Sequence, residues 1–255
     1  MTTLLQLPIV FAEIVGIVAL ADFLAGVVHW LEDAYFNEET PVIGPLVIRP
    51  NIVHHHLPRY MTKLNWWESS RELVVLGSVV VGGAWMLHAL TWQVWFFVAL
   101  SVNANQVHKW SHQSRAENGT IVSRLQDWKV LQTVQHHGLH HKDPKNTYYC
   151  PITNFVNPAL ERIRFWNHLE SIIERLTGIT HRDDTAIRGH GPGPAWLEGY
   201  RPVSAGRADP TPVPVAVSVP AKPATLLARR ANPCGRNCAN CPRLRTRSQA
   251  RDSFK

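Results

Sequence analysis

The chain has few cysteines: it contains four in 255 residues, so the sequence gives no support for a disulfide framework. It also has no Gly-rich dinucleotide-binding fingerprint, which argues against a built-in nicotinamide or flavin electron source. No Lys or Arg precedes the first apolar segment, whereas a secretory signal peptide has a basic start. We therefore expect that segment to be retained as a helix.

The charge is unevenly distributed. The net charge is +7, and arginines concentrate toward the C-terminus. A basic tail suits nucleic acid or an anionic membrane surface; the apolar segments of the same chain favour the membrane, and we expect no nucleic-acid partner. Composition predicts a Pro-rich disordered linker at 189–233 and a Cys/Arg-rich tail at 234–255. Within the tail, Cys234, Cys238 and Cys241 are compatible with incidental thiols, a zinc site or an iron–sulfur site.

Two long apolar stretches lie in the first half of the chain, at 4–30 and 73–107. The second is too long for one membrane span of about 20 residues, and 87–91 suits a tight turn between two spans. The alternative, one long core helix of a soluble protein, fits the density of Val, Trp and Phe poorly. We expect an all-α, multi-pass helical membrane protein with about three to four spans. Further helices are predicted at 123–135, leading into a block of histidines, and at 157–178, where the spacing of apolar residues is amphipathic.

Basic residues flank these stretches asymmetrically. Lys and Arg follow the first and the last predicted span, whereas the turn at 87–91 carries neither. The positive-inside rule then places the His-bearing regions in the cytoplasm and the short turn outside. The basic residues are Arg49, Arg59, Lys63 and Arg71 after the first span, and Lys109, Arg115, Arg124 and Lys129 after the last.

The chain is rich in histidine, and most of its 14 histidines fall in a few blocks. Imidazole is the commonest side-chain ligand for iron, zinc and copper. Residues four apart share one face of a helix, so a pair at this spacing can present two ligands to one ion. Clustered cationic imidazoles would repel one another, and metal binding holds them neutral. Four such pairs are His29/Asp33, His108/His112, His136/His140 and His137/His141.

The cluster His54-His55-His56 adds further imidazoles to these pairs. This many clustered histidines favours two redox metals over one zinc ion. A structural zinc site needs about four ligands and usually includes Cys. Asp22 lies seven residues before His29, on nearly the same helix face. A carboxylate behind a ligating histidine fixes its tautomer, and either Asp22 or Asp33 suits this role. Asp33 could instead ligate directly, and Asp22 could instead make a hydrogen bond in helix packing.

A series of short blocks between residues 21 and 184 is distinctive as a set. Together they resemble the membrane lipid desaturase family, whose members introduce double bonds into the alkyl chain of plasmanylethanolamine or into fatty-acyl chains of phospholipids. Any one block alone is a weak signal. The blocks are 21–30, 48–50 followed by His54-His55, 105–112, 125–128, 136–141, 147–150 and 165–170.

The resemblance implies a desaturase membrane domain over 1–188 with two iron ions and no catalytic side chain beyond their ligands. Asp22 and Asn105 are expected to support the ligands from behind, and Arg49 and Lys109 to contact a lipid phosphate. The implied ligands are His29, Asp33, His54, His55, His108, His112, His136, His137, His140 and His141.

The implied reaction uses O2 and the two irons to remove two hydrogens from neighbouring carbons of a phospholipid chain, giving a double bond and water. Electrons would come from an external ferredoxin or cytochrome-type donor. A di-iron lipid hydroxylase and a non-enzymatic membrane metal-binding protein are the alternatives. One departure bears on the lipid: family members active on ether lipids carry a Thr-Arg-His-Asp-Phe block where Leu64 replaces the His here, and His56 is an extra histidine that could compensate.

Overall fold

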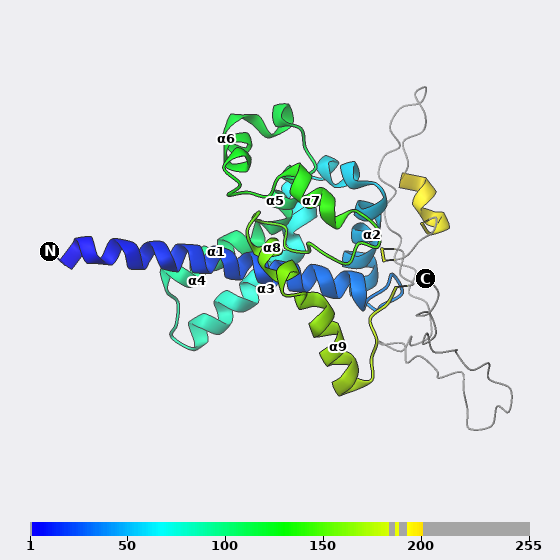
Figure 1. Cartoon of the computed structure of the whole chain (residues 1–255), viewed down its shortest axis with the longest axis horizontal. Helices are drawn as coiled ribbons and strands as arrows, with labels where there is room; N and C mark the ends of the chain where they lie inside the picture. Colours follow the sequence, from blue (N-terminus) through cyan, green and yellow to red (C-terminus); the bar gives the residue numbers. More distant parts are fainter. Residues whose placement is uncertain (1, 184–186, 189–192, 201–255) are drawn as a thin grey trace, which may run out of the picture.

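The computed structural model describes residues 2–183, 187–188 and 193–200, with side chains from residue 6 onward. Within these residues the chain is helical and contains no strand, which confirms the all-α prediction (Figure 1). The elements are α1 (Thr2–Ala34), η1 (Gly44–Ile48), α2 (Arg49–His56), η2 (Pro58–Lys63), α3 (Trp66–Met86), α4 (Trp92–Val102), α5 (Ala104–Trp110), α6 (Arg115–Asp127), α7 (Val134–His140), α8 (Val156–Arg162), α9 (Phe165–Thr177) and η3 (Ala195–Tyr200).

Most of the predicted linker and the whole predicted tail, with its three cysteines, lie outside the described residues. One part of the predicted linker is described: η3 is a short 3-10 helix whose Leu197 is buried. Its Trp196 packs against the buried Ile48 and Ile52 around α2. A segment beyond the last family-like block therefore covers the outer side of α2.

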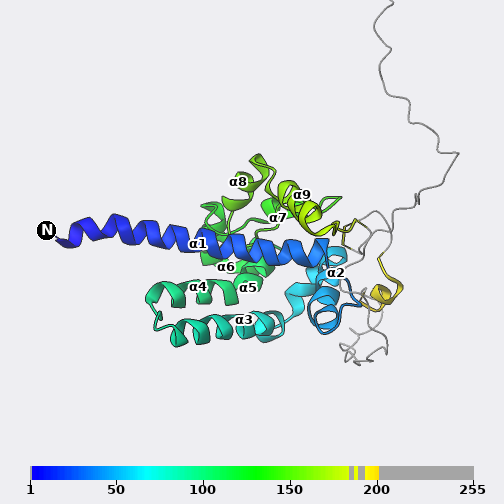
Figure 2. The ribbon, with the colours of Figure 1, turned by 90° about the horizontal axis from the view of Figure 1, so that it is seen from below.

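Helix α1 is long, apolar and largely unpacked in its first half. Figures 1 and 2 both show it projecting as a single rod beyond the rest of the helices. Its Leu7, Ile9 and Phe11 are 65%, 60% and 68% exposed, which a core helix of a soluble protein would not show. Among the described helices it is the one long and apolar enough to cross a membrane, over Gln6–Ala34.

The second apolar stretch forms a helical hairpin. Helix α3 begins with a capping box in which Asn65 and Glu68 exchange hydrogen bonds, and it ends at Met86, where the predicted turn begins. Helix α4 then packs against both α3 and α1. Gly77 of α3 permits the close approach of α3 and α4, because a Cβ at this position would lie 2.9 Å from a methyl carbon of Val102 in α4. At 11 residues α4 is short for a span, so the predicted number of spans is not established by helix length.

Two of the predicted helices each cover parts of two separate helices in the structure. Helix α6 ends at Asp127 and α7 begins only at Val134, because Lys129 adopts a positive φ of 59° that an α-helix cannot continue through. The predicted helix at 157–178 is divided into α8 and α9 by Arg164, which has a φ of 52°. Both breaks use left-handed backbone at a non-glycine residue, which composition does not reveal.

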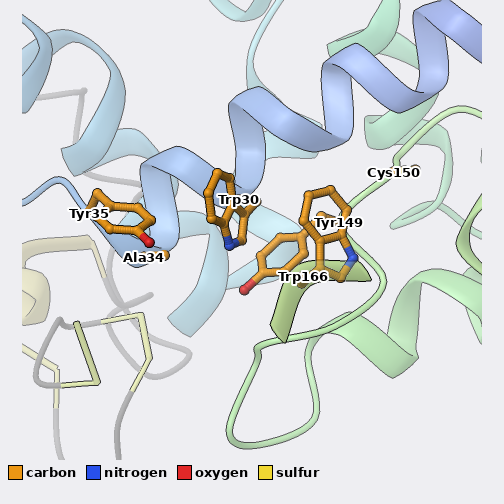
Figure 3. Packing of buried hydrophobic residues seen from close by; sticks show 6 residues of the cluster. All are labelled: Trp30, Ala34, Tyr35, Tyr149, Cys150 and Trp166. Atoms are coloured by element: carbon orange, nitrogen blue, oxygen red, sulfur yellow. The ribbon is translucent and has the colours of Figure 1, made fainter. Parts of the chain in front are cut away.

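The core behind the C-terminal half of α1 is aromatic. Trp30 of α1 stacks on Trp166 of α9 with ring centroids 5.8 Å apart, and Tyr149 meets Trp166 edge-on at 4.9 Å (Figure 3). The indole N–H of Trp30 donates a 3.0 Å hydrogen bond to the buried carboxylate of Glu170. This core fixes α1 against the 147–153 segment, and His29 lies at that junction.

Candidate metal centre

Four helices bring the predicted ligands together. His29 and Asp33 come from α1, the pair His54-His55 from α2, and the other histidines from α5, α7 and the residues that follow them. Helices α2, α5 and α7 gather around the C-terminal half of α1 (Figures 1 and 2). The side chains form two groups, each with ligand atoms within 4.8 Å of one another: a five-His group of His54, His108, His112, His137 and His141, and a His-Asp group of His29, Asp33, His55 and His140.

The five-His group contains imidazole donors alone. The Nε2 atom of His137 lies 2.8 Å from Nε2 of His108 and 3.0 Å from Nε2 of His141. The ring of His54 stands edge-on to the ring of His108, with centroids 4.5 Å apart. Three helices therefore direct imidazole nitrogens toward one small volume.

The His-Asp group is built around the buried carboxylate of Asp33. Its Oδ1 lies 3.4 Å from Nε2 of His55 and 3.9 Å from Nε2 of His29, and its Oδ2 lies 3.5 Å from Nε2 of His140. The rings of His29 and His140 meet edge-on at 4.5 Å. This group thus combines three imidazoles with one carboxylate.

Helix periodicity explains how sequence neighbours divide between the groups. Successive residues on an α-helix point about 100° apart. His54 consequently joins the five-His group while His55 joins the His-Asp group, and His140 and His141 divide in the same way at the end of α7. His137 and His141, four residues apart, stay together as predicted.

The buried imidazole nitrogens fit a metal. Among the described residues, neither ring nitrogen of His54 has a hydrogen-bond partner although the residue is 4% exposed, and the same holds for Nε2 of His29 and of His112. A buried polar atom without a partner costs about 1–3 kcal/mol. Several such costs at one point are resolved when nitrogen lone pairs coordinate a cation.

The imidazoles of both groups are also held neutral. Burial removes them from water and lowers their pKa values, and the neighbouring imidazoles act in the same direction for most of them. A neutral ring offers one lone pair for coordination. The pKa is lowered well below its usual value at His54, His55, His108, His137 and His140, to about 4 at His112 and to about 3 at His141.

Three fixed contacts support the His-Asp group from outside. Nδ1 of His29 lies 3.1 Å from the carbonyl oxygen of Tyr149, and Nδ1 of His140 lies 2.7 Å from that of Thr147. Because a carbonyl only accepts, each Nδ1 carries the proton and each Nε2 keeps its lone pair for the group. The amide of Asn51 donates a 2.8 Å hydrogen bond to Oδ1 of Asp33.

The 147–153 segment that supplies these carbonyls is itself anchored. Asp22 accepts hydrogen bonds from the backbone N–H groups of Ile152 and Thr153, at 2.7 and 3.0 Å, and from the Thr153 hydroxyl at 2.5 Å. Asn157 bonds both the N–H and the carbonyl of Cys150. The segment thus ties the N-terminal helix to the middle of the chain.

Comparison with known proteins bears on this arrangement of histidines. The lipid desaturase domain family matches residues 18–184, well over half of the chain. The chain belongs to the lipid desaturase domain family.

Named relatives agree with this assignment. A probable fatty acid desaturase of Acanthamoeba polyphaga mimivirus is 34% identical over 177 residues, covering 68% of this chain and 86% of the relative. Plasmanylethanolamine desaturase 1 of Mus musculus is 32% identical over 189 residues, covering 69% of each. Fatty acid desaturase 4 of Arabidopsis thaliana, a chloroplastic protein, is 27% identical over 185 residues, covering 70% and 54%. No solved structure matches the chain.

One predicted ligand of this lipid desaturase, His136, lies outside both groups. Its Nε2 accepts a 3.3 Å hydrogen bond from the amide of Asn157, and its ring faces Tyr148 at 5.1 Å. His136 precedes His140 by one helical turn, about 5.4 Å. The side chain of His136 therefore contacts Asn157 and Tyr148, whereas His140, one turn later, reaches Asp33. The extra histidine, His56, also lies outside both groups.

The predicted supporting residues have different partners from those expected. Asp22 anchors the 147–153 segment rather than an imidazole, which agrees with the packing alternative. Asn105 donates its amide to the carbonyl of Ser69 at 2.6 Å and so connects α5 to α3. Sequence reasoning missed Asn51, although it precedes His55 by four residues and so shares its helix face.

The two predicted phosphate contacts also differ from each other. Lys109 is 4% exposed, and its ammonium donates a 2.5 Å hydrogen bond to the carbonyl of Leu64. The Lys109 ammonium is thus engaged by the protein backbone, and its contact with a lipid phosphate stays a prediction. Arg49 is half-buried, with its guanidinium 5.9 Å from the centre of the Trp196 ring.

Proposed function

We propose that this chain is an O2-dependent lipid desaturase that introduces a carbon–carbon double bond into an alkyl or acyl chain of a membrane phospholipid, with two iron ions held by the five-His and His-Asp groups. The observation that carries the proposal is the presence of two adjacent buried donor groups in a member of this family. Imidazole with carboxylate suits iron, which can change its oxidation state. The names of the relatives support plasmanylethanolamine or fatty-acyl substrates.

Bound iron would supply the oxidation of two neighbouring C–H bonds with O2. The donor side chains of the two groups would hold the ions, and the Nδ1 contacts of His29 and His140 would keep their rings oriented. Asn51 would orient the Asp33 carboxylate. Arg49 is the candidate for a phosphate contact. Balance of the reaction requires two electrons and two protons besides the two substrate hydrogens, so we propose an external ferredoxin or cytochrome-type donor.

The proposed membrane arrangement is multi-pass, with the His groups on the cytoplasmic side. The exposed apolar surface of α1 and the apolar hairpin of α3 and α4 support it. The hairpin turn at 87–91 lacks Lys and Arg, whereas Arg49 and Arg59 precede α3 and Lys109 follows α4.

Lipid analysis tests the proposed function directly. The chain is expressed in a host that lacks its own enzymes of this class, and the double bonds of its ether and acyl lipids are compared with those made with the His137→Ala variant. New double bonds with the parent chain and none with the variant are expected. Hydroxylated chains in place of new double bonds would identify a hydroxylase. Unchanged lipids despite bound metal and a supplied electron donor would contradict the proposal.

A further inference from the structure

Helix α6 has an inverted pattern of burial. Its polar Ser123 and Gln126 are 4% and 7% exposed, while its apolar Ile121 and the capping Trp128 that follows its last residue are 76% and 71% exposed. A helix on the surface of a soluble protein normally buries its apolar stripe and exposes its polar face.

The buried polar face is fully engaged with the fold. The Ser123 hydroxyl donates to the carbonyl of Arg115 at 3.2 Å. The Gln126 amide donates to the carbonyl of Gln132 at 3.0 Å and to that of Trp110 at 3.3 Å. The Gln126 contacts reach residues outside α6 and fix the rotation of the helix, so the outward direction of the apolar side chains is built into the fold.

The two exposed apolar side chains belong to one stripe with Leu125. Ile121, Leu125 and Trp128 follow the spacing of i, i+4 and i+7, which places them on one helix face. Leu125 is half-buried, and Arg124 and Lys129 beside the stripe are exposed. An apolar stripe that contains an indole and is bordered by cations is the composition of a helix lying in a membrane interface.

The position of α6 agrees with that environment. Figures 1 and 2 place it at the level of the middle of α1, short of the end that carries the His groups. On α1 the exposed apolar surface continues through Leu20, Leu24 and Val28. A bilayer that covers this surface therefore reaches the level of α6.

We propose that the stripe of Ile121, Leu125 and Trp128 is a membrane-docking surface that inserts into the lipid interface beside α1, with Arg124 and Lys129 toward the headgroup phosphates. The proposal rests on the membrane placement of α1 and not on the desaturase chemistry.

Environment-sensitive labelling tests the proposal on the full chain. The tail cysteines are changed to Ser, and Cys150 stays unlabelled because it is buried. A fluorescent NBD label is placed on Ile121→Cys and, as a matched control, on Val42→Cys, an apolar site 70% exposed that follows the C-terminal end of α1. The protein is reconstituted at one copy per phospholipid nanodisc, with and without lipids that carry a nitroxide near the headgroup end of the acyl chain.

We expect a blue-shifted emission and loss of fluorescence with nitroxide lipid at position 121, and neither at position 42. A label on Trp128→Cys should behave as at 121, which guards against a local defect of one variant. Emission at both stripe positions as water-exposed as at 42 would overturn the proposal. So would a blue shift that appears only with two copies per disc and without quenching, because the occupant would then be a second copy of the chain. Lipid desaturation is not measured, so failure here is distinct from failure of the proposed function.

Discussion

The two donor groups lie side by side and share two helices, α2 and α7, yet they are built differently. The five-His group offers imidazoles alone, and its members His54, His137 and His141 have Nδ1 atoms without a hydrogen-bond partner among the described residues. The His-Asp group contains a carboxylate, and contacts from Asn51, Thr147 and Tyr149 hold three of its four donors.

The His-Asp group is therefore preorganised for metal binding, whereas the five-His group is adaptable. Donors fixed by outer hydrogen bonds lose little freedom when a cation arrives, and a carboxylate adds charge attraction. We therefore expect the His-Asp group to take up the first equivalent of metal and to release it last. The five-His group, with freer rings, is expected to exchange its metal faster and to change its coordination more easily during turnover.

The largest expected effect follows removal of one donor from either group. His140→Ala and His137→Ala should each abolish turnover, because an ion that loses one imidazole also loses its geometry. Metal analysis should distinguish them: His140→Ala depletes the His-Asp group and His137→Ala the five-His group. His136→Ala is the control and should keep both metals, since its ring contacts Asn157 and Tyr148 instead. Equal loss in all three variants would show that the two groups were wrongly divided.

A smaller effect is expected from Asn51→Leu, which removes the hydrogen bond to Asp33 while keeping the side-chain volume similar. Loss of such an outer contact typically lowers metal affinity about 10–100-fold. Competition with a chelator should show weaker retention of one metal and unchanged retention of the other. Asn105→Leu removes a hydrogen bond from an asparagine amide to a backbone carbonyl that belongs to neither donor group, and it serves as control. Unaltered retention of both metals in Asn51→Leu would remove the basis for calling the His-Asp group preorganised.

The Gly26→Ala variant examines the anchored segment behind the His-Asp group. A Cβ at Gly26 would lie 2.5 Å from Sγ of Cys150 and 3.1 Å from its backbone, so the segment that bonds His29 must shift. Overpacking of this kind costs about 1–3 kcal/mol. A lower unfolding temperature and weaker metal retention are expected together.

Two further variants isolate the cause. Gly16→Ala has open space around its new methyl group and should not destabilise the protein. Adding Cys150→Ala to Gly26→Ala removes the sulfur contact but not the backbone contacts, so partial recovery is expected. Full stability of Gly26→Ala alone would mean that the segment is free to move and does not hold His29.

Local spacing allowed much of this centre to be predicted. The pairs His108/His112 and His137/His141, each four apart, lie together as predicted, whereas His136/His140 does not, and the break between α3 and α4 was found from the length of the apolar stretch. Helix periodicity predicts that His54 and His55 point in different directions, but which donor group each one joins depends on how α2 is placed among its neighbours, which no local pattern reports. The carbonyl contacts of Thr147 and Tyr149 use backbone atoms, which every residue possesses, so they leave no signal in the sequence.

The smallest effect is expected from removing everything after Tyr200. Every donor of the two groups lies at or before His141, and the family match ends at residue 184. The truncated protein should therefore keep both metals and their different retention, and should still desaturate lipid. The competing idea is that Cys234, Cys238 and Cys241 relay electrons. Supplying excess reductant and donor protein to the truncated and full-length enzymes separates the two: equal product formation supports a dispensable tail, whereas product from the full-length enzyme alone, with both metals still bound in each, would make the tail part of the electron path.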